Sequence, residues 1–530
     1  MACNIGTEIL VIGGGVTGAG VAYDAAMRGF KTILVEKGDL THGTTGRYHG
    51  LLHSGGRYAV KDPQAAHECI VENRILKRIM PEAIEDTGGF FILLPTDNEV
   101  YADRWAVACA AADIDVEELT PEEALAQEPL LNPKIRRAFR VPDAACDSFD
   151  ALHALARAIR TYGGQVWPRR RVEALISGGG RVCGATVRDL VSDQIIHLAA
   201  DLVINAAGPW ADQIAAMAGC NLDIEHSKGT LIAYASRVVN TIINRCAMPG
   251  DGDILVPVGT VSVIGTTSVH VDDPDRYAIE HWEVEQLRLR GAELVPALAH
   301  ARSLRAWAGV RPLIKSLAVT DDGRAQSRTH TVINHTEVDG VAGFISIVGG
   351  KFTTFRLMAE DAVNLACVKL GTARPCRTAE ESLPGSEAQH YFALGERLER
   401  LDKGDLPGEL VCECEIVSRA QLKAAIEENG SHILSDLRRD LRLGMGPCQG
   451  AFCAWRAAGV LREVAELPSE DANAALVDFM QARWKGVCPV ADNQTARQVA
   501  LNLRLYRGLL GVDKLPRSGQ TEPYPTEKTS

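Results

Sequence analysis

The sequence predicts an α/β protein with a small helical unit at its C-terminal end, and three observations support this prediction. The chain begins with a strand, a glycine-rich turn, a helix and a second strand, which is the start of a parallel sheet. A second strand, glycine turn and helix follow at 341–370, and four of the 14 cysteines cluster at 412–453. The chain of 530 residues is also too long for one ordinary core, so several units are expected.

Bulk composition excludes some classes of function. The net charge of -12 argues against a nucleic-acid partner, because phosphate backbones attract basic surfaces. No basic segment precedes the apolar run at 9–12, and no stretch approaches the roughly 20 apolar residues that span a bilayer. We therefore expect a soluble chain, or one that meets a membrane only through its edge or a partner.

The first glycine turn fits the pattern G-x-G-x-x-G. Gly13 permits the tight turn, Gly15 lets backbone approach a pyrophosphate, and Gly18 lets helix and strand pack closely. Glu36 ends the second strand about 20 residues further on, where an acid can hold ribose hydroxyls. The strand, helix and strand are expected at 9–12, 18–28 and 31–36. The turn therefore predicts a dinucleotide site.

Two further segments favour FAD over NAD. A run of small and polar residues at 43–58 stands where an NAD dehydrogenase would usually continue the sheet with another helix, and Thr44, Thr45 and Gly46 in it can contact the cofactor. At 344–354 a strand leads through a glycine pair into a helix, so Gly350 and Thr353 place backbone amides at a helix start. Two such sites at opposite ends of one unit suit an extended cofactor.

Several blocks in this order resemble the FAD-dependent glycerol-3-phosphate dehydrogenases. The cysteine-bearing C-terminus narrows the resemblance to the flavin-carrying catalytic subunits of the anaerobic enzymes. The blocks are the first glycine turn, 53–58, 203–210 (with Ala207 and Gly208 as cofactor contacts), 264–267, 309–313 and 349–354.

The resemblance implies an FAD-binding doubly wound (Rossmann-like) domain interleaved with an α+β substrate domain. We expect an oxidoreductase unit at 1–375, with FAD-binding segments at about 1–90, 150–215 and 340–372 and the substrate domain at about 90–150 and 215–340. A linker at 376–409, a [2Fe-2S]-binding domain at 410–465, a helical region at 466–516 and a disordered polar tail at 517–530 would follow.

The resemblance also implies a reaction. It is the oxidation of sn-glycerol 3-phosphate to dihydroxyacetone phosphate, with hydride passing from C2 to flavin N5. Electrons would then leave through the iron–sulfur cluster and partner subunits, including a membrane-anchoring iron–sulfur subunit, to the quinone pool at the cytoplasmic face of the inner membrane. Two alternatives stay open: a flavin-dependent amine or 2-hydroxy-acid oxidoreductase of the same fold, and a non-catalytic flavin/iron–sulfur electron-transfer subunit.

Cationic side chains are the candidates for binding the substrate. The planar fork of Arg311 suits a phosphate or an alkoxide, although a surface salt bridge is the plainer interpretation. Lys351 can place positive charge near the flavin or the substrate, or it is simply solvated. The remaining candidates rest mainly on the resemblance: Arg328 at the phosphate, Arg57 and Tyr58 beside the flavin, and Thr266 and Thr267 as hydroxyls for the substrate.

The general base is not evident from the residues. His53 lies in the flavin segment and is a candidate, yet a lone histidine is more often structural. The aerobic relatives carry a histidine just after a Lys-Gly pair, whereas here Thr230 follows Lys228 and Gly229. The proton would therefore pass to His53 or through water.

The four clustered cysteines predict a metal centre. Cys412 and Cys414 form one close pair, and Cys448 and Cys453 form the other within a glycine-rich segment. Four thiolates can hold one [2Fe-2S] cluster or one zinc ion, but C-x-C is less usual for zinc than C-x-x-C. The pattern resembles the bacterioferritin-associated-ferredoxin-like [2Fe-2S] domain, with zinc and unmetallated thiols as alternatives. Such a cluster could pass on singly the two electrons that a flavin receives as hydride.

Overall fold

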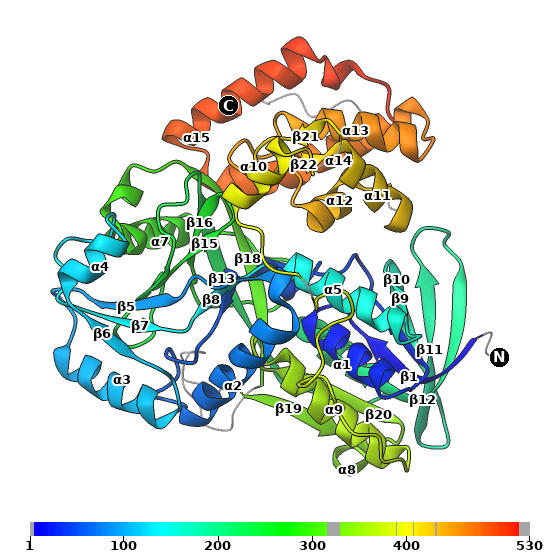
Figure 1. The fold of residues 1–530 in the computed structure, drawn as a ribbon. Coiled ribbons are helices and arrows are strands. Elements are labelled where there is room, and N and C mark those ends of the chain that lie inside the picture. Colours follow the sequence, from blue (N-terminus) through cyan, green and yellow to red (C-terminus); the bar gives the residue numbers. More distant parts are fainter. Residues whose placement is uncertain (1–4, 315–328, 388, 406–407, 430–431, 519–530) are drawn as a thin grey trace.

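The computed structural model describes residues 5–314, 329–387, 389–405, 408–429 and 432–518. Two large sheets lie side by side, and a helical unit formed by the last part of the chain sits against one end of both (Figure 1). The first sheet comprises β1 (Ile5–Ile12), β2 (Thr32–Val35), β9 (Gln165–Trp167), β10 (Arg170–Gly178), β11 (Arg181–Asp189), β12 (Ile195–Asn205), β19 (His330–Asn334) and β20 (Phe344–Gly349).

The centre of the first sheet is parallel. β1 pairs in parallel with β2 and β12, β2 pairs in parallel with β9, and the end of β12 pairs in parallel with β20. The first half of β12 instead pairs antiparallel with β11, so the sheet divides along this strand. The carboxyl ends of β1, β12 and β20 therefore meet at one edge, the usual place for a ligand in such a sheet.

Helices bury one face of this sheet. α1 (Val16–Met27) is almost wholly buried and packs against α5 (Ser148–Thr161) and α9 (Phe355–Lys369) (Figure 1). Alanines fill the contacts, which lets the three helices approach closely. α2 (Pro63–Ile79) borders this layer and is capped by the carboxylate of Asp62.

The second sheet is mostly antiparallel and includes β5 (Gly89–Leu93), β6 (Glu117–Leu119), β7 (Arg137–Val141) and the strands that follow the first sheet's β12. Its longest pair is β13 and β18, which are in antiparallel register from Ile224 opposite Ile314 to Tyr234 opposite Ser303. α7 (His281–Leu294) packs on β13 and β16. The other strands are β13 (Ile224–Tyr234), β14 (Ile242–Arg245), β15 (Ile254–Val258), β16 (Val261–Gly265), β17 (Val269–His270) and β18 (Ser303–Ile314). Three short strands, β3 (Leu51–Leu52), β4 (Ile84–Glu85) and β8 (Ala144–Cys146), form a separate small sheet, and α3 (Glu99–Ala111), α4 (Pro121–Gln127), α6 (Ala211–Ala216) and α8 (His335–Val338) complete this part.

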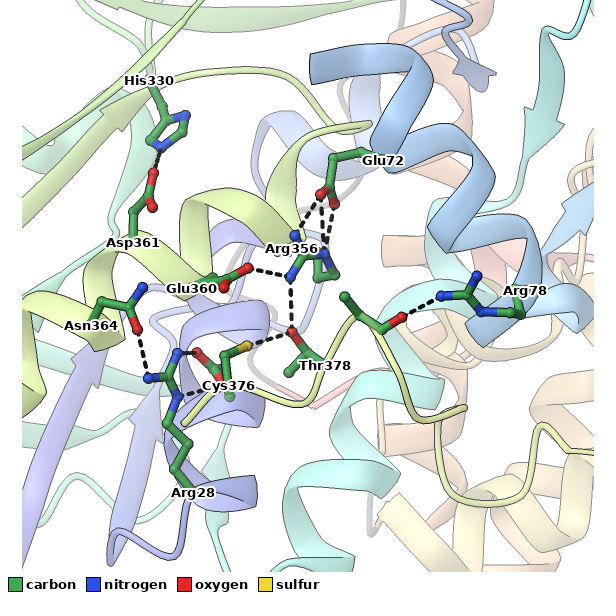
Figure 2. A network of polar contacts seen from close by, with 12 residues as sticks. Arg28, Glu72, Arg78, His330, Arg356, Glu360, Asp361, Asn364, Cys376 and Thr378 are labelled. Atoms are coloured by element: carbon green, nitrogen blue, oxygen red, sulfur yellow. Dashed lines mark hydrogen bonds and ion pairs between the residues drawn. The ribbon is translucent and has the colours of Figure 1, made fainter. Parts of the chain in front are cut away.

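The start of the expected linker is packed rather than loose. Leu383 is fully buried and its amide donates to Ile79, while Thr378 accepts from Arg356. Figure 2 shows Arg356 between α2 and this segment. The residues after α9 therefore form a strap across the helical layer, and the expected short helix is α10 (Leu394–Asp402).

The C-terminal unit has a hydrophobic core of its own. Its elements are β21 (Leu410–Cys412), β22 (Val417–Ser418), α11 (Arg419–Asn429), α12 (Leu434–Leu441), α13 (Cys453–Val464), α14 (Ser469–Val487) and α15 (Asn493–Leu503). The part of the chain that the structure describes has no helix that is both long and apolar enough to cross a bilayer. Of the polar tail expected at 517–530, residues 519–530 lie outside the described part.

The strands and helices predicted around both glycine turns agree with the observed elements to within a few residues. One expected boundary differs, since β19 at 330–334 pairs antiparallel with β20 and so belongs to the first sheet rather than to the substrate region that was expected to extend to about 340. Short polar strands at a sheet edge carry little hydrophobic alternation, which is why the sequence did not indicate it.

Candidate active site and four-cysteine centre

A cleft of about 1600 Å³, open to solvent, runs along the carboxyl edge of the first sheet and under the second. Its lining comes from segments far apart in the chain, all of which converge at the ends of β1, β2, β12, β18 and β20. Among the predicted residues it includes Gly13, Gly15, Glu36, Thr44, Thr45, His53, Tyr58, Ala207, Gly208, Arg311, Gly350 and Lys351. Gly18, Gly46, Arg57 and Thr353 are not part of this lining.

The glycines of the first turn have no room for a side chain. Gly13 has a φ of 115°, and a Cβ there would lie 2.5 Å from the carbonyl oxygen of Ala206. A Cβ on Gly18 would lie 1.9 Å from the carbonyl oxygen of Gly13. The turn therefore brings the N-terminus of α1 directly to the cleft, where its amides suit a pyrophosphate.

Glu36 braces this turn from the end of β2. One carboxylate oxygen accepts the amide of Gly14 at 2.6 Å and the other accepts that of Gly38 at 2.7 Å. Burial raises the pKa of Glu36, and the two amide hydrogen bonds oppose that rise. The carboxylate also faces the cleft, so it can hold ribose hydroxyls as predicted while fixing the backbone around it.

The segment at 44–53 is tied to both sheets. The Thr45 hydroxyl accepts the amide of Val16 at 3.0 Å, and the Thr44 hydroxyl donates to the carbonyl of Val310 at 2.6 Å. A Cβ on Gly46 would meet the carbonyl of Thr41 at 2.4 Å, so this glycine serves packing. The cofactor segment is thus held in place before any ligand binds.

The second glycine turn is anchored by α9. Gly350 has a φ of 74° and lies against Met358, which would be 2.4 Å from a Cβ. The Thr353 hydroxyl accepts the amide of His53 at 3.0 Å, so it clamps the first segment to the second and does not face the cleft. In Figure 2 the buried Arg356, in the first turn of α9, makes a two-pronged ion pair with Glu72 of α2 at 2.5 Å.

Arg311 is the cation at the far end of the cleft. Its guanidinium donates to the hydroxyl of Ser227 at 3.2 Å, to the hydroxyl of Thr266, and to the carbonyl of Thr267 at 3.3 Å. Gly229 makes room for it, because a Cβ there would lie 2.4 Å from the guanidinium. The predicted Arg311 and Thr266 therefore meet at the end of the β13–β18 ladder.

Thr267 is placed behind this cation rather than in the cleft. It is fully buried, its hydroxyl donates to Glu283 at 2.7 Å, and it accepts the amide of Thr230 at 2.9 Å. The Glu283 carboxylate, on α7, also accepts from Thr230 at 2.8 Å and from the ammonium of Lys228 at 2.7 Å. Burial opposes ionisation of Glu283, but the hydrogen bond from Lys228 and the other donors leave its pKa below the ordinary value. This buried charge pair fixes the strands that carry Arg311.

A second group of side chains faces the cleft near the glycine turns. The ammonium of Lys351 lies over the ring of Tyr58, 5.1 Å from its centroid, and the ring of His53 lies 5.4 Å from that of Tyr58. His49 follows at 5.9 Å from His53. Tyr58, Lys351 and His53 are thus brought together as predicted.

His49 is a neutral hydrogen-bond donor. Its Nδ1 accepts the amide of Leu51 at 3.1 Å, so the ring proton lies on Nε2. Burial, assisted by Arg57 and Arg311, lowers the pKa of His49 to about 3. This ring cannot take up a proton at Nε2 near neutral pH.

Two predicted arginines do not contribute to this arrangement. Arg57 pairs with Asp253 at 2.5 Å and donates to the carbonyl of Gly250 at 3.3 Å, so it joins the cleft segment to the second sheet. Arg328 lies outside the described residues.

The four predicted cysteines converge in the C-terminal unit. The Cys453 thiol donates to Cys412 and Cys448, and the Cys414 thiol donates to Cys448. Hydrogen bonds from Cys414 and Cys453, with those from the amides of Phe452 and Gly450, lower the pKa of Cys448 to about 2. Amides of Gly444 and Glu415 likewise face Cys412. Thiols that share protons in this way, with amides aimed at sulfur, fit a common metal centre.

The spread of the sulfurs favours two irons over one zinc. Tetrahedral zinc with Zn–S bonds of about 2.3 Å would draw all four sulfurs within about 4 Å of one another. Across the described ranges, the one group of three ligand atoms within 4.8 Å of one another is Cys220, His335 and Asp339, in the first sheet. The four cysteines are more extended than that, as a two-iron cluster requires.

This fold and cleft define a flavin-dependent oxidoreductase, and the model of the FAD dependent oxidoreductase family matches residues 8–358. The chain therefore carries FAD, and the match of residues 410–463 to the BFD-like [2Fe-2S] binding domain assigns the cysteine centre. The chain belongs to the family of flavin-carrying anaerobic glycerol-3-phosphate dehydrogenases: it is 42% identical to the corresponding protein of Escherichia coli (strain K12), over 96% of this chain and 97% of that protein.

Solved structures share the fold. The glycerol-3-phosphate dehydrogenase of Bacillus halodurans, complexed with FAD, aligns with a TM-score of 0.66 and 22% identity, covering 93% of this chain and 97% of that one. The glycine oxidase of Geobacillus kaustophilus aligns with a TM-score of 0.56 and 21% identity, covering 72% of this chain and 99% of that one. The fold alone therefore does not choose the substrate.

Sequence reasoning missed several residues of the site. His49 and Tyr48 stand within the predicted small-residue run, and Phe352 stacks on Tyr48 with centroids 4.9 Å apart in the cleft. No spacing signal separates them from their neighbours. Glu283 gave no signal because a glutamate near a helix start is typical of a surface cap.

Proposed function

We propose that this chain oxidises sn-glycerol 3-phosphate to dihydroxyacetone phosphate and passes the electrons on through its iron–sulfur centre. The carrying observation is Arg311, a cation held by three neighbouring groups at the end of a flavin cleft that also contains Lys351. Two fixed cations suit an anionic substrate, and the full-length relatives favour a phosphate monoester over a carboxylate.

The chain's own residues divide the work. Arg311, supported by Thr266, binds the anionic end of the substrate or the oxygen on C2, and Lys351 places a second positive charge beside it. Arg328 is proposed as a further phosphate ligand. Bound FAD supplies the acceptor for the C2 hydride.

The proton on the C2 hydroxyl needs a separate acceptor. His49 carries its proton on Nε2 and stays neutral, so it orients an oxygen by donating to it. We propose His53, its neighbour in the same segment, as the base, with water as the alternative route. A His53→Gln variant should lose substrate-driven flavin reduction far more than it loses FAD; an unchanged rate would assign the proton to water.

The partners are inferred from the relatives. The E. coli relative is one subunit of its enzyme, which supports a complex with further subunits here. We propose that one of them anchors the assembly at the cytoplasmic face of the membrane and passes electrons to quinone. Affinity purification of the tagged chain from membranes, followed by identification of co-purifying iron–sulfur proteins, tests this assembly.

The decisive experiment follows the visible absorbance of the flavin under anaerobic conditions. Glycerol 3-phosphate should bleach it, whereas glycine, proline and small 2-hydroxy acids should not. Bleaching by an amino or hydroxy acid alone would assign the chain to those oxidoreductases. Failure of every substrate to bleach the flavin would leave a non-catalytic electron-transfer protein.

A further inference from the structure

The cysteine unit docks on the flavin unit through charges that α12 presents. Asp436 pairs with Arg169, Arg439 pairs with Asp39 at 2.8 Å, and Asp440 lies 2.9 Å from the ring of His153. These residues of α12 are nearly buried, with side-chain exposures between 5% and 9%. α12 lies over α5 (Figure 1). Buried pairs of both signs suit one defined register better than apolar contact would.

Arg442, directly after α12, lies where three parts of the molecule meet. Its guanidinium donates to Asp147, the cap of α5, at 2.5 Å and to Glu415, the neighbour of Cys414, at 2.9 Å. It also lies under the turn between β15 and β16, where a Cβ on Gly259 would be 3.3 Å away. Arg442 itself has a left-handed φ of 60°, so the chain is turned there to deliver this side chain.

A short series of contacts runs from the flavin cleft to Cys414 through this arginine. The hydroxyl of Tyr48, which lines the cleft, donates to the carbonyl of Cys146 at 2.9 Å. Cys146 precedes Asp147, and Arg442 joins Asp147 to Glu415. Three hydrogen bonds and two adjacent residue pairs thus bridge the two sites.

The other connection between the two units is much longer. Arg302 donates to the carbonyl of Pro447 beside Cys448 at 3.0 Å, at the start of β18. Arg311 stands nine residues further along β18, or about 30 Å at roughly 3.3 Å per residue. The α12 side therefore provides the close approach.

We propose that Arg442 is the positioning residue for internal electron transfer, because it holds the four-cysteine centre against the wall of the cleft that Tyr48 lines. In the step that it serves, the reduced flavin loses one electron and the oxidised cluster gains it. This inference rests on the proposed electron route but not on the proposed substrate.

The test replaces Arg442 by methionine, which keeps length and removes the charge, in the full chain loaded with FAD and cluster. Light with EDTA as electron donor reduces the flavin without any substrate, and the electron paramagnetic resonance signal of the reduced cluster is then followed in time. We expect cluster reduction to slow on the order of tenfold while flavin reduction is unchanged. Arg442→Lys, which keeps the charge, should fall between.

The matched control is Arg419→Met, which breaks an exposed pair with Glu463 in the same unit. A second readout is hydrogen exchange of 434–441 and 144–150, which should accelerate in Arg442→Met and not in the control. Wild-type cluster kinetics and exchange in Arg442→Met, with FAD and iron retained, would overturn the inference. If Arg442→Met loses its cofactors, Arg442→Lys with wild-type kinetics and exchange supports it, and slowed kinetics without faster exchange refutes it. Failure of glycerol 3-phosphate to bleach the flavin would overturn the substrate alone.

Discussion

The flavin cleft and the cysteine centre are built in opposite ways. The cleft collects its lining from residues 12 to 352, brought together by the strand order of two sheets. The cysteine centre takes all its ligands from 412–453, within one small core. A site assembled by long-range topology depends on the whole fold, whereas a site assembled by a local turn depends on that turn. The two cofactors should therefore be removable one at a time.

The largest expected effect is the loss of FAD alone. Gly18→Ala forces a Cβ to within 1.9 Å of the Gly13 carbonyl, which pushes α1 away from the pyrophosphate. We expect FAD content below about one tenth with cluster iron retained, measured by absorbance and iron analysis. Gly6→Ala, whose Cβ meets nothing within 4 Å, is the control and should keep both cofactors.

The converse change removes iron alone. Cys448→Ser deletes the sulfur that accepts from two thiols and two amides, so the cluster should be lost while FAD stays stoichiometric. Cys183→Ser, an exposed cysteine in the first sheet, should change neither content. Loss of FAD together with iron in Cys448→Ser would show that the two regions are interdependent after all.

Within the cleft, Arg311→Ala should cripple turnover and spare the flavin. We expect kcat/KM to fall by about 10²–10³-fold, since a fixed cation facing the reacting substrate is removed. Arg276→Ala, at an exposed arginine of the second-sheet region, is the matched control. Normal kinetics for Arg311→Ala would remove this residue from the site.

A smaller effect is expected behind the cleft. Glu283→Gln leaves Lys228 with a weaker buried partner and loosens Thr267, so Arg311 should lose its fixed position. We expect KM to rise on the order of tenfold with a smaller change in kcat, and weaker binding of unreactive phosphate analogues in flavin difference spectra. Glu285→Gln, an exposed glutamate on the same helix, should have wild-type constants. A fall in melting temperature without a change in KM would restrict Glu283 to a structural role.

The smallest effect concerns pH. The folded pKa of His49, about 3, lies below its ordinary value of 6.5, so between these values the unfolded chain binds the extra proton. Stability of the wild type therefore falls as pH falls through this window, and His49→Asn should lose less stability from pH 7 to pH 5, as measured by thermal unfolding. Because His49 is neutral throughout, the variant should also keep the shape of the pH profile of kcat/KM between pH 6 and 8. A profile that lost an ionisation near pH 6.5 would contradict this assignment.

The features that could be predicted share one property, which is that a local backbone requirement selects the residue type. Gly13, Gly18 and Gly350 occupy positions without space for a Cβ, and the four cysteines must supply sulfur. Such requirements appear in the sequence at fixed spacing, and so the flavin fold and the metal centre were both foreseeable from it.

Side-chain partners across the fold were not foreseeable. Arg57 and Thr267 were expected at the flavin and the substrate, yet the structure ties one to Asp253 and the other to Glu283. Which of several neighbouring polar groups faces a cleft depends on strand register, and the β13–β18 register is set over many residues at once.

By itself, therefore, the sequence determined the cofactor class, the order of the units and the four sulfur ligands, because these depend on short-range stereochemistry and on atom type. Only the tertiary structure decided that Glu283 supports Arg311, that His49 keeps its proton on Nε2, and that Arg442 joins the two sites. Each of those depends on the distance between residues remote in the chain, which packing of the completed fold alone sets.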